Sequence, residues 1–313
     1  MDEYRRSFLK TLMGAGFMSV IAGSPLDAMA SALNLPGYPD QFGVLVDTTV
    51  CIGCRRCEWA CKEWNKLPNQ KPLKQYESDR DVFNKIRRTR DDTYTVVNRY
   101  PNPRDPSRFI YVKKQCMHCF EPGCASSCFV KAFTKRPVGA VTYDASLCVG
   151  CRYCMAACPF DIPAYQYYNA FTPEVTKCTF CFDRISKTGG VPACVEICPV
   201  ETMTFGKRKD LVELAHKKIR DNPDRYVNHV YGEHEVGGTC WLYLAGVPFD
   251  QIGFRTDLGT VAIPTLSKPF LSLVSPVFIV IPALAMGFYS FKRRRDEIAH
   301  EEVKKALEKK EGK

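Results

Sequence analysis

Sixteen of the seventeen cysteines in this 313-residue chain fall into four groups of four, and their spacing predicts their chemistry. Groups one and three share the spacing C-x2-C-x2-C-x3-C, and a proline follows group three. In such a sequence a tight loop wraps three thiolates around one cube of iron and sulfide, while the fourth cysteine binds a second cube. We therefore predict four 4Fe–4S clusters as cofactors. The predicted iron ligands are Cys51, Cys54, Cys57 and Cys61; Cys116, Cys119, Cys124 and Cys128; Cys148, Cys151, Cys154 and Cys158; and Cys178, Cys181, Cys194 and Cys198.

Other cysteine chemistries fit this spacing less well. Zinc sites usually join two cysteine pairs about a dozen or more residues apart, whereas groups one and three each place three cysteines close together. Disulfides are disfavoured because the crowded spacing leaves few workable pairings within a group. Haem attachment requires a histidine directly after C-x2-C, but His118 lies inside its pair of cysteines. The remaining cysteine, Cys240, has no cysteine neighbour and is predicted to be a buried structural thiol.

The sequence around the first cysteine group recurs further along the chain. The pattern of residues 44–61 returns 97 residues later at 141–158. The two copies share a valine and an aspartate before the first cysteine, and a glycine and an arginine between the cysteines. Groups two and four are also similar to each other, since Lys114 stands shortly before group two and Lys177 stands directly before group four. This repetition predicts two ferredoxin-like modules in tandem.

Each cysteine group is flanked by a short apolar run and a short helical segment. Strands are predicted at 42–46, 109–113, 140–143 and 203–205. The predicted fold is therefore α+β: tandem ferredoxin-like 4Fe–4S modules with insertions, plus one C-terminal transmembrane helix. Residues 31–263 would form the four-cluster domain. Within it, the polar, proline-dotted stretch 66–106 is too long for a simple connection and is predicted to be an insertion that could face a partner.

The N-terminus has the features of an export signal. Paired arginines at 5 and 6 precede Phe-Leu-Lys, a mildly apolar run follows, and small residues flank a cleavage point after Ala30. Residues 1–30 thus resemble a twin-arginine signal peptide. That pathway exports folded proteins, which suits a protein whose metal is inserted in the cytoplasm. Free thiols threaded unfolded into an oxidising compartment would instead pair as disulfides.

Near the C-terminus an uncharged stretch is long enough to cross a membrane. Residues 270–291 contain no charged side chain and would span about 33 Å as a helix. We expect residues 264–291 to form a transmembrane anchor, with prolines that membrane helices tolerate. Four basic residues at 292–295 place the tail, 292–313, in the cytoplasm. The domain would then lie on the periplasmic face of the cytoplasmic membrane.

The formal net charge of +10 does not indicate a nucleic-acid partner. Each 4Fe–4S centre with its four thiolates carries about two negative charges, which a count of neutral thiols ignores. The sequence also lacks a recognition helix, an RNA-binding aromatic pattern and a zinc-finger spacing. We therefore predict no nucleic-acid binding.

Several longer stretches resemble one known family. They are residues 111–119 and 148–155 within the cysteine groups, and 231–233, 237–239 and 244–248 beyond them. With the signal and the anchor, they make the whole chain similar to the HybA-like iron–sulfur subunits of hydrogenase-2 type complexes. These belong to the four-cluster ferredoxin-like subunits of the molybdopterin oxidoreductase superfamily. Phe129 departs from the family pattern, because relatives often have a proline directly after the cysteine that corresponds to Cys128.

The resemblance implies that the cysteine groups exchange their fourth ligands. Groups one and four would form one pair, so that one cluster takes Cys51, Cys54, Cys57 and Cys198 and another takes Cys178, Cys181, Cys194 and Cys61. Groups two and three would form the other pair. Their clusters would take Cys116, Cys119, Cys124 and Cys158, and Cys148, Cys151, Cys154 and Cys128. The four centres would then form a chain.

The resemblance also implies a relay function. The chain would pass electrons between a periplasmic catalytic partner, most simply the small and large subunits of a nickel–iron hydrogenase, and a multi-pass quinone-reactive membrane subunit. A molybdopterin subunit, such as that of a formate dehydrogenase or a sulfur or nitrogen oxide reductase, is the alternative partner. A zinc-binding scaffold is the alternative of another class. No nucleophile–base pair or nucleotide fingerprint appears, so we expect no catalysis by this subunit itself.

Overall fold

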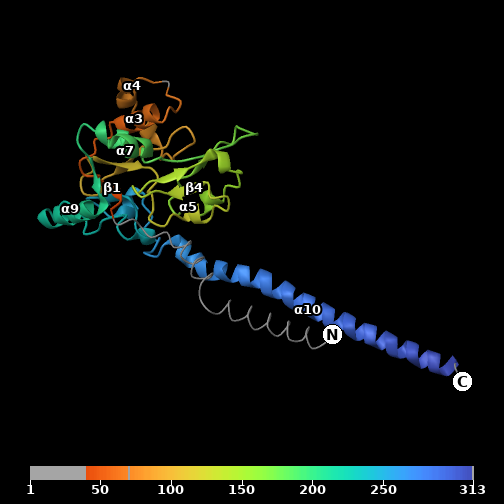
Figure 1. Ribbon diagram of the computed structural model, residues 1–313. Coiled ribbons are helices and arrows are strands. Elements are labelled where there is room, and N and C mark those ends of the chain that lie inside the picture. The colour runs from red at the N-terminus through yellow and green to blue at the C-terminus, as the bar shows by residue number, and fades with distance from the viewer. Residues whose placement is uncertain (1–39, 70, 312–313) are drawn as a thin grey trace. The chain divides into compact units, whose positions relative to one another are not determined.

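The computed structural model describes residues 40–69 and 71–311, and it divides into two compact units at Leu266. The first unit contains the strands and all the cysteines, and the second, from Ser267 onward, is helical. The first unit mixes short helices with short strands, in agreement with the predicted α+β class (Figure 1). The export signal predicted at 1–30 lies outside the described residues.

A three-stranded sheet forms the centre of the first unit. Its strands are β1 (Phe42–Asp47), β8 (Met203–Lys207) and β9 (Trp241–Leu244), in the order β8-β1-β9. β1 pairs antiparallel with β8, with Val44 opposite Phe205, and parallel with β9, with Val44 opposite Trp241. Because β1 precedes the first cysteine group and β8 follows the fourth, this pairing draws the two outer groups together.

Alternation along the sheet divides its side chains between two apolar clusters. Val44 and Trp241 belong to the cluster that also contains cysteines, whereas Leu45 and Leu242 belong to a second cluster. Helix α9 (Arg208–Asp221) supplies Leu211, Ala215 and Ile219 to this second cluster, at the four-residue spacing that defines one helix face. The sheet is thus covered by α9 on one face and faces the cysteines with the other.

Three two-stranded hairpins surround the sheet. Strands β4 (Phe133–Lys135) and β5 (Val141–Tyr143) lie between cysteine groups two and three in the sequence. Their antiparallel pairing brings these two groups together, just as the pairing of β1 with β8 brings groups one and four together. The hairpin strands are β2 (Val96–Pro101) with β3 (Phe109–Lys114), β4 (Phe133–Lys135) with β5 (Val141–Tyr143), and β6 (Ala164–Tyr165) with β7 (Val175–Thr176).

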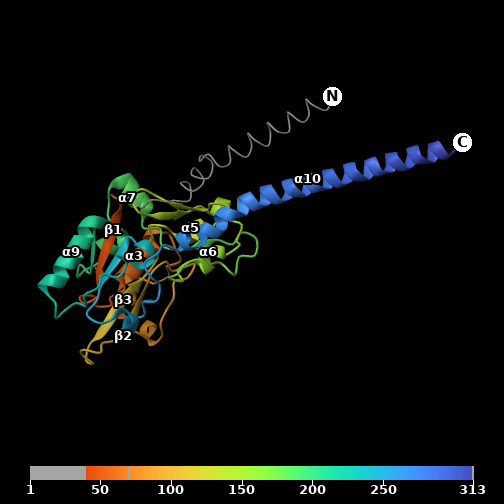
Figure 2. The same cartoon turned by 90° about the horizontal axis from the view of Figure 1, so that it is seen from below.

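The helices of the first unit are short, and most begin beside a cysteine. Helix α3 (Arg56–Trp64) packs against α8 (Ala193–Glu196), and α5 (Gly123–Ser126) packs against α6 (Tyr153–Ala156), so that the outer groups and the inner groups form separate pairs. Figure 2 shows α5 and α6 next to each other. Besides α9, the first unit contains the helices α3 (Arg56–Trp64), α4 (Leu73–Ser78), α5 (Gly123–Ser126), α6 (Tyr153–Ala156), α7 (Phe182–Thr188) and α8 (Ala193–Glu196). It also contains the 3-10 turns η1 (Asp81–Asn84), η2 (Ala145–Leu147), η3 (Glu235–Gly237) and η4 (Phe249–Ile252).

The predicted strands agree with β1, β3, β5 and β8 to within two residues at each end. The modules are nested rather than consecutive, since the inner pair of groups lies within the chain segment that separates the outer pair. The stretch 66–106 also packs into the domain: it contributes β2, whose Val96 and Val97 are buried. Its conformation therefore depends on the cysteine domain itself.

Helix α10 (Ile263–Glu311) begins at the end of the first unit and contains the described residues of the second unit. It includes Pro269, Pro276 and Pro282. Its apolar part is long and hydrophobic enough to cross a membrane by length and composition, and none of the described side chains in that part is buried. The helix thus contains both the segment predicted as an anchor and the charged segment predicted as a tail.

The fold yields one prediction about Glu58 on α3, which is 2% exposed and ties the stretch 66–106 to the first cysteine group. Its carboxylate pairs with Arg55 at 3.0 Å and accepts from Arg87 Nη1 at 3.1 Å and from the Val97 amide at 2.6 Å. Glu58→Ala leaves two guanidinium groups without their partner and should lower the free energy of unfolding by about 3–5 kcal/mol. The free energy of unfolding is measured by anaerobic chemical denaturation, with circular dichroism as the signal.

The matched control is Glu63→Ala, on the exposed side of the same helix. It should change the free energy of unfolding by less than about 0.5 kcal/mol. Equal effects of the two substitutions would show that the buried ion pairs around Glu58 do not hold the domain together.

Candidate functional site

The four cysteine loops share one backbone geometry. In every group the residue before the second cysteine adopts a left-handed conformation: φ is 67° at Gly53, 49° at His118, 71° at Gly150 and 60° at Phe180. Glycine enters this region without strain, whereas other residues do so at a cost of about 1 kcal/mol or more. The same turn at His118 and Phe180 indicates that the loop shape is required at all four places.

This turn directs backbone amides toward sulfur. The Gly150 amide lies 3.4 Å from Cys148 Sγ, and the Phe180 amide lies 3.3 Å from Cys178 Sγ. Near the fourth cysteine of group two, the Ala132 amide lies 3.3 Å from Cys128 Sγ. Amide donors of this kind stabilise sulfur that carries negative charge, as in iron–sulfur sites.

The structure brings the sixteen predicted cysteines together in four sets, which we call sites A to D. Each set joins three cysteines of one group to the last cysteine of another. Site A is Cys51, Cys54, Cys57 and Cys198; site B is Cys178, Cys181, Cys194 and Cys61; site C is Cys116, Cys119, Cys124 and Cys158; site D is Cys148, Cys151, Cys154 and Cys128.

Site A surrounds a small cavity whose wall includes all four of its cysteines. The pKa of the Cys51 thiol is raised to about 11, chiefly by burial and in addition by the neighbouring Cys54 and Cys198. The backbone of Gly53 opposes this rise by hydrogen bonding. At site B, burial raises the pKa of Cys61, and its three partners from group four add to the effect.

Sites C and D show the same pattern. At site C, burial raises the pKa of Cys119 most strongly, and its three partners in the set raise it as well. At site D, the pKa of Cys154 is raised to about 11, chiefly by burial and in addition by its three partners. Thiols this buried stay protonated at neutral pH on their own, so binding of a metal centre must displace their protons.

The four sites adjoin one another in a fixed order. Cys57 of site A and Cys194 of site B belong to one buried cluster of side chains. Cys178 of site B packs with Cys116 of site C. In a further cluster, Cys124 of site C lies with Cys154 of site D. The order is therefore A-B-C-D, with sites A and D at the two ends.

Three buried lysines lie among these sites, and the sequence reasoning missed them. Lys113, Lys135 and Lys177 are each at most 5% exposed. Lys135 Nζ donates to the Cys119 carbonyl at 2.9 Å, and Lys177 Nζ donates to the Cys178 carbonyl at 3.2 Å. The repeat pointed to Lys177, directly before group four, but before group two it pointed to Lys114 and not to Lys113.

The residues present fit 4Fe–4S clusters. The donors are thiols in four sets of four, with amides directed at sulfur and ammonium groups nearby. His118, within the loop of site C, adds an orphaned donor: its Nδ1 accepts from the Val141 amide at 2.9 Å, which leaves the proton on the fully buried Nε2. That Nε2 has no hydrogen-bond partner in the described part of the chain, and cluster or cysteine sulfur is an acceptor of the kind it lacks.

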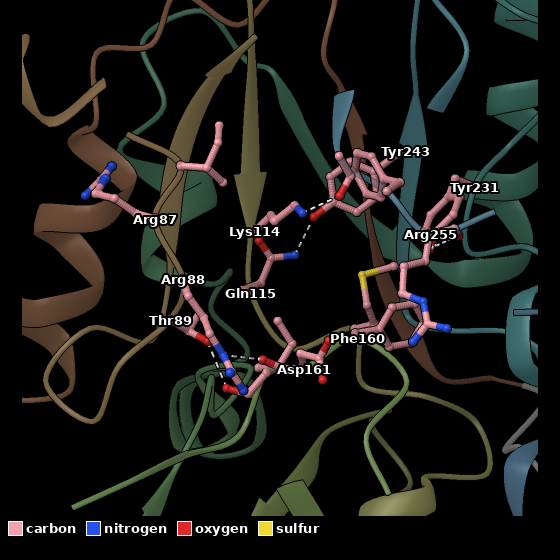
Figure 3. A pocket seen from close by; sticks show the side chains of 15 residues that line it. Arg87, Arg88, Thr89, Lys114, Gln115, Phe160, Asp161, Tyr231, Tyr243 and Arg255 are labelled. Carbon is pink, nitrogen blue, oxygen red and sulfur yellow. Dashed lines mark hydrogen bonds between the residues drawn. The ribbon is translucent and has the colours of Figure 1, made fainter. Parts of the chain in front are cut away.

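A pocket beside site C shows how the stretch 66–106 supports the cysteines (Figure 3). Arg88 and Thr89 form one wall and reach the segment that follows Cys158. Arg88 Nε donates to the Asp161 carbonyl at 2.9 Å, and Thr89 Oγ1 donates to the Ile162 carbonyl at 2.8 Å. The stretch therefore holds the loop of site C as well as α3.

Cys240 belongs to none of the four sites. It is fully buried, and its Sγ donates to the Gly139 carbonyl at 3.2 Å. The prediction of a buried thiol is confirmed.

Comparison with known proteins agrees with this architecture. Residues 107–208 match the 4Fe-4S dicluster domain. The chain is 52% identical over 303 residues to a protein of Nitratidesulfovibrio vulgaris, covering 97% of this chain and 80% of that one. It is 35% identical to the hydrogenase-2 operon protein HybA of Escherichia coli O157:H7, covering 79% and 82% of the two chains. It is 32% identical to the iron-sulfur subunit of the nitrate-inducible formate dehydrogenase of Escherichia coli K12, covering 72% and 75%.

The fold and the four cysteine sets define the class of 4Fe–4S ferredoxin-like proteins. Within that class, the chain belongs to the family of HybA-like and formate dehydrogenase iron–sulfur subunits. The formate dehydrogenase relative is by name an iron–sulfur subunit, which agrees with the expectation of a subunit that is not itself catalytic.

The exchange of fourth ligands can be tested by combining substitutions. The intact protein should contain about sixteen iron atoms, and Cys61→Ala or Cys178→Ala alone should reduce this to about twelve. The double variant Cys61→Ala/Cys178→Ala should also keep about twelve, because both residues belong to site B. Iron and acid-labile sulfide per polypeptide are the measurements.

The control is Cys57→Ala/Cys61→Ala, whose two residues lie four apart in one group but belong to sites A and B. It should lose two clusters and keep about eight iron atoms. The reverse result, one cluster lost here and two lost in the site B double variant, would mean that each group binds its own cluster.

Proposed function

We propose that this protein is an electron-transfer subunit that relays electrons through four 4Fe–4S clusters, held at sites A, B, C and D by the sixteen cysteines. The clusters, when bound, supply one-electron transfer. The protein's own part is to hold the ligands, exclude water and fix the order of the sites. The observation that carries the proposal is the continuous order A-B-C-D, in which each site adjoins the next.

The geometry favours clusters over zinc. None of the seventeen cysteines is paired in a disulfide, which supports metal centres over a disulfide framework. Across residues 40–69 and 71–311, no three His, Cys, Asp or Glu side chains converge closely enough to hold a single metal ion. A four-cysteine zinc site requires such convergence, since all four sulfurs lie about 2.3 Å from one ion. A four-iron cube separates its ligands more widely.

Site D is the more exposed end and is surrounded by apolar side chains. Cys151 is solvent-exposed. Phe129, next to Cys128, is 73% exposed, and Tyr153, between two site D cysteines, is 62% exposed. A concentration of exposed apolar side chains around one end of a relay is typical of a protein interface. Further exposed apolar residues of this segment are Leu147, Val149, Tyr167, Tyr168 and Phe171.

The C/D end also lies beside the start of α10. Ile263, the first residue of α10, lies so close to Gly123 of α5 that a Cβ added to the glycine would come within 3.2 Å of it. If α10 is the membrane anchor, site D is the end that passes electrons to or from a quinone-reactive membrane subunit. Site A, whose surface includes Arg104, Arg108 and Arg225, then faces the catalytic partner.

The relatives bear on the identity of that catalytic partner. We propose a nickel–iron hydrogenase, because HybA is a hydrogenase-2 operon protein and matches this chain at higher identity and greater coverage than the formate dehydrogenase subunit. A molybdopterin subunit of a formate dehydrogenase is the second candidate, supported by the 32% identity to that subunit.

We further propose a periplasmic location, with residues 1–30 as a twin-arginine signal, 31–263 as the four-cluster domain, 264–291 as the anchor and 292–313 as a cytoplasmic tail. The long apolar part of α10 supports the anchor. The four basic residues directly after it support a cytoplasmic tail, because positive residues accumulate on that side.

The function is tested on the complex purified in mild detergent. We expect about four clusters per copy of this chain, together with a nickel-containing hydrogenase and a multi-pass subunit. A photo-crosslinker placed at Tyr168 should capture the multi-pass subunit, and one placed at Phe109 near site A should capture the catalytic subunit. Four zinc ions without acid-labile sulfide would refute the relay, and a molybdenum-containing partner would select the second candidate.

The anchor is tested by truncation. A stop codon after Pro269 removes most of α10 and should release a folded protein with all four clusters into the soluble periplasmic fraction. The full-length chain, expressed likewise without partner subunits, should remain in the membrane fraction. If the truncated chain also stays in that fraction, then α10 is not the anchor.

A further inference from the structure

Lys113, on β3, carries a positive charge in the interior of the domain. Its side chain is 4% exposed. Its Nζ donates to Gln115 Oε1 at 2.9 Å and lies 4.5 Å from the centre of the Trp241 ring. Among the described residues, no carboxylate forms an ion pair with it. An ammonium group buried without an anionic partner is strongly unfavourable, so an anion must be supplied by another component.

The position of Lys113 identifies the source of that anion. It lines the cavity of site A together with Cys57. Burial by itself lowers the pKa of Lys113, yet the pKa is raised, because Cys194, Cys57, Tyr243 and Cys178 lie around the ammonium. Cys57 belongs to site A, and Cys194 and Cys178 belong to site B. Lys113 therefore lies where these two sites adjoin.

The neighbours of Lys113 hold the ammonium in place. Gln115 accepts from Lys113 Nζ. It donates through Nε2 to the Tyr243 hydroxyl at 2.6 Å, a contact drawn in Figure 3. The Tyr243 hydroxyl donates in turn to the Lys113 carbonyl at 2.9 Å. These groups are uncharged, so they orient the lysine without neutralising it. The position of the charge is fixed while its effect on sites A and B is preserved.

We propose that Lys113 is the shared counter-ion of the centres at sites A and B, and that it raises the reduction potentials of both. The proposal rests on the proposed function, since it requires iron–sulfur clusters at these sites. An added electron makes a centre more negative, and a fixed positive charge in a low-dielectric interior stabilises that reduced state. Because one charge serves both sites, it raises both potentials and keeps them close to each other.

The test compares two lysines that are adjacent in sequence. Lys113→Met removes the buried charge and keeps a side chain of similar length. Lys114→Met removes the same formal charge from the next residue of β3, which points to the opposite side of the strand. The Lys114 ammonium donates to the Gly253 carbonyl and borders the pocket of Figure 3. Lys113→Arg restores the positive charge, and Lys113→Gln is a second neutral variant in case the methionine variant does not accumulate.

Each variant is purified in its complex, assayed for iron and acid-labile sulfide, and titrated anaerobically while electron paramagnetic resonance records the midpoint potential of each cluster. We expect Lys113→Met or Lys113→Gln to lower two of the four potentials and leave the other two unchanged. Lys113→Arg should restore both, and Lys114→Met should change none. Because the charge is buried, the shift should persist at high salt.

Three results would overturn the proposal: unchanged potentials in the neutral Lys113 variants, equal lowering of all four potentials, or the same lowering in Lys114→Met. Failure of the proposed function is distinguishable from these. It would appear as an absence of iron and acid-labile sulfide in the wild-type protein, before any variant is compared.

Discussion

The mutual repulsion of buried sulfur is the constraint on which this structure depends. Sixteen cysteines are brought together in one small domain, and both burial and neighbouring cysteines raise the pKa of the thiols of Cys51, Cys61, Cys119 and Cys154. A metal centre bound by thiolates at such a place needs compensating groups close to sulfur. The amides of Gly150 and Phe180 and the buried lysines supply them. The left-handed turns before the second cysteines follow from the same need, because they direct amides toward sulfur.

The strand pairings solve the second part of this problem, which is how a fourth ligand reaches each site. A single loop can present three cysteines, but the fourth must come from another loop held at a fixed distance. β1 pairs with β8 and thereby aligns the first and fourth groups, and β4 pairs with β5 and aligns the second and third. Since each pairing exchanges two cysteines, the sites of a pair are necessarily adjacent. Contact between Cys178 and Cys116 then joins the two pairs into one series.

Much of the site followed from the sequence, because cysteine spacing is a local property. The four groups, the strands beside them and the buried state of Cys240 could all be predicted from residues near each cysteine. The resemblance to a family was needed for the exchange of fourth ligands. Lys113 could not be predicted, because its burial depends on β3 facing sites A and B and on Trp241 from a strand over a hundred residues away. Likewise, Arg87 and Glu58 meet across a connection that looks polar and independent in the sequence.

Part of the positive net charge lies inside the domain near the cysteines and not on its surface. The formal value of +10 counts Lys113, Lys135 and Lys177, which are inside the domain and face neutral or sulfur-containing groups. Four thiolate-bound clusters would contribute about two negative charges each and offset most of this formal excess. The lysines that make the sequence look basic are thus partly an internal counter-charge to the cofactors. The arginines near site A are instead at the surface, where the field they create can steer a partner toward that end of the relay.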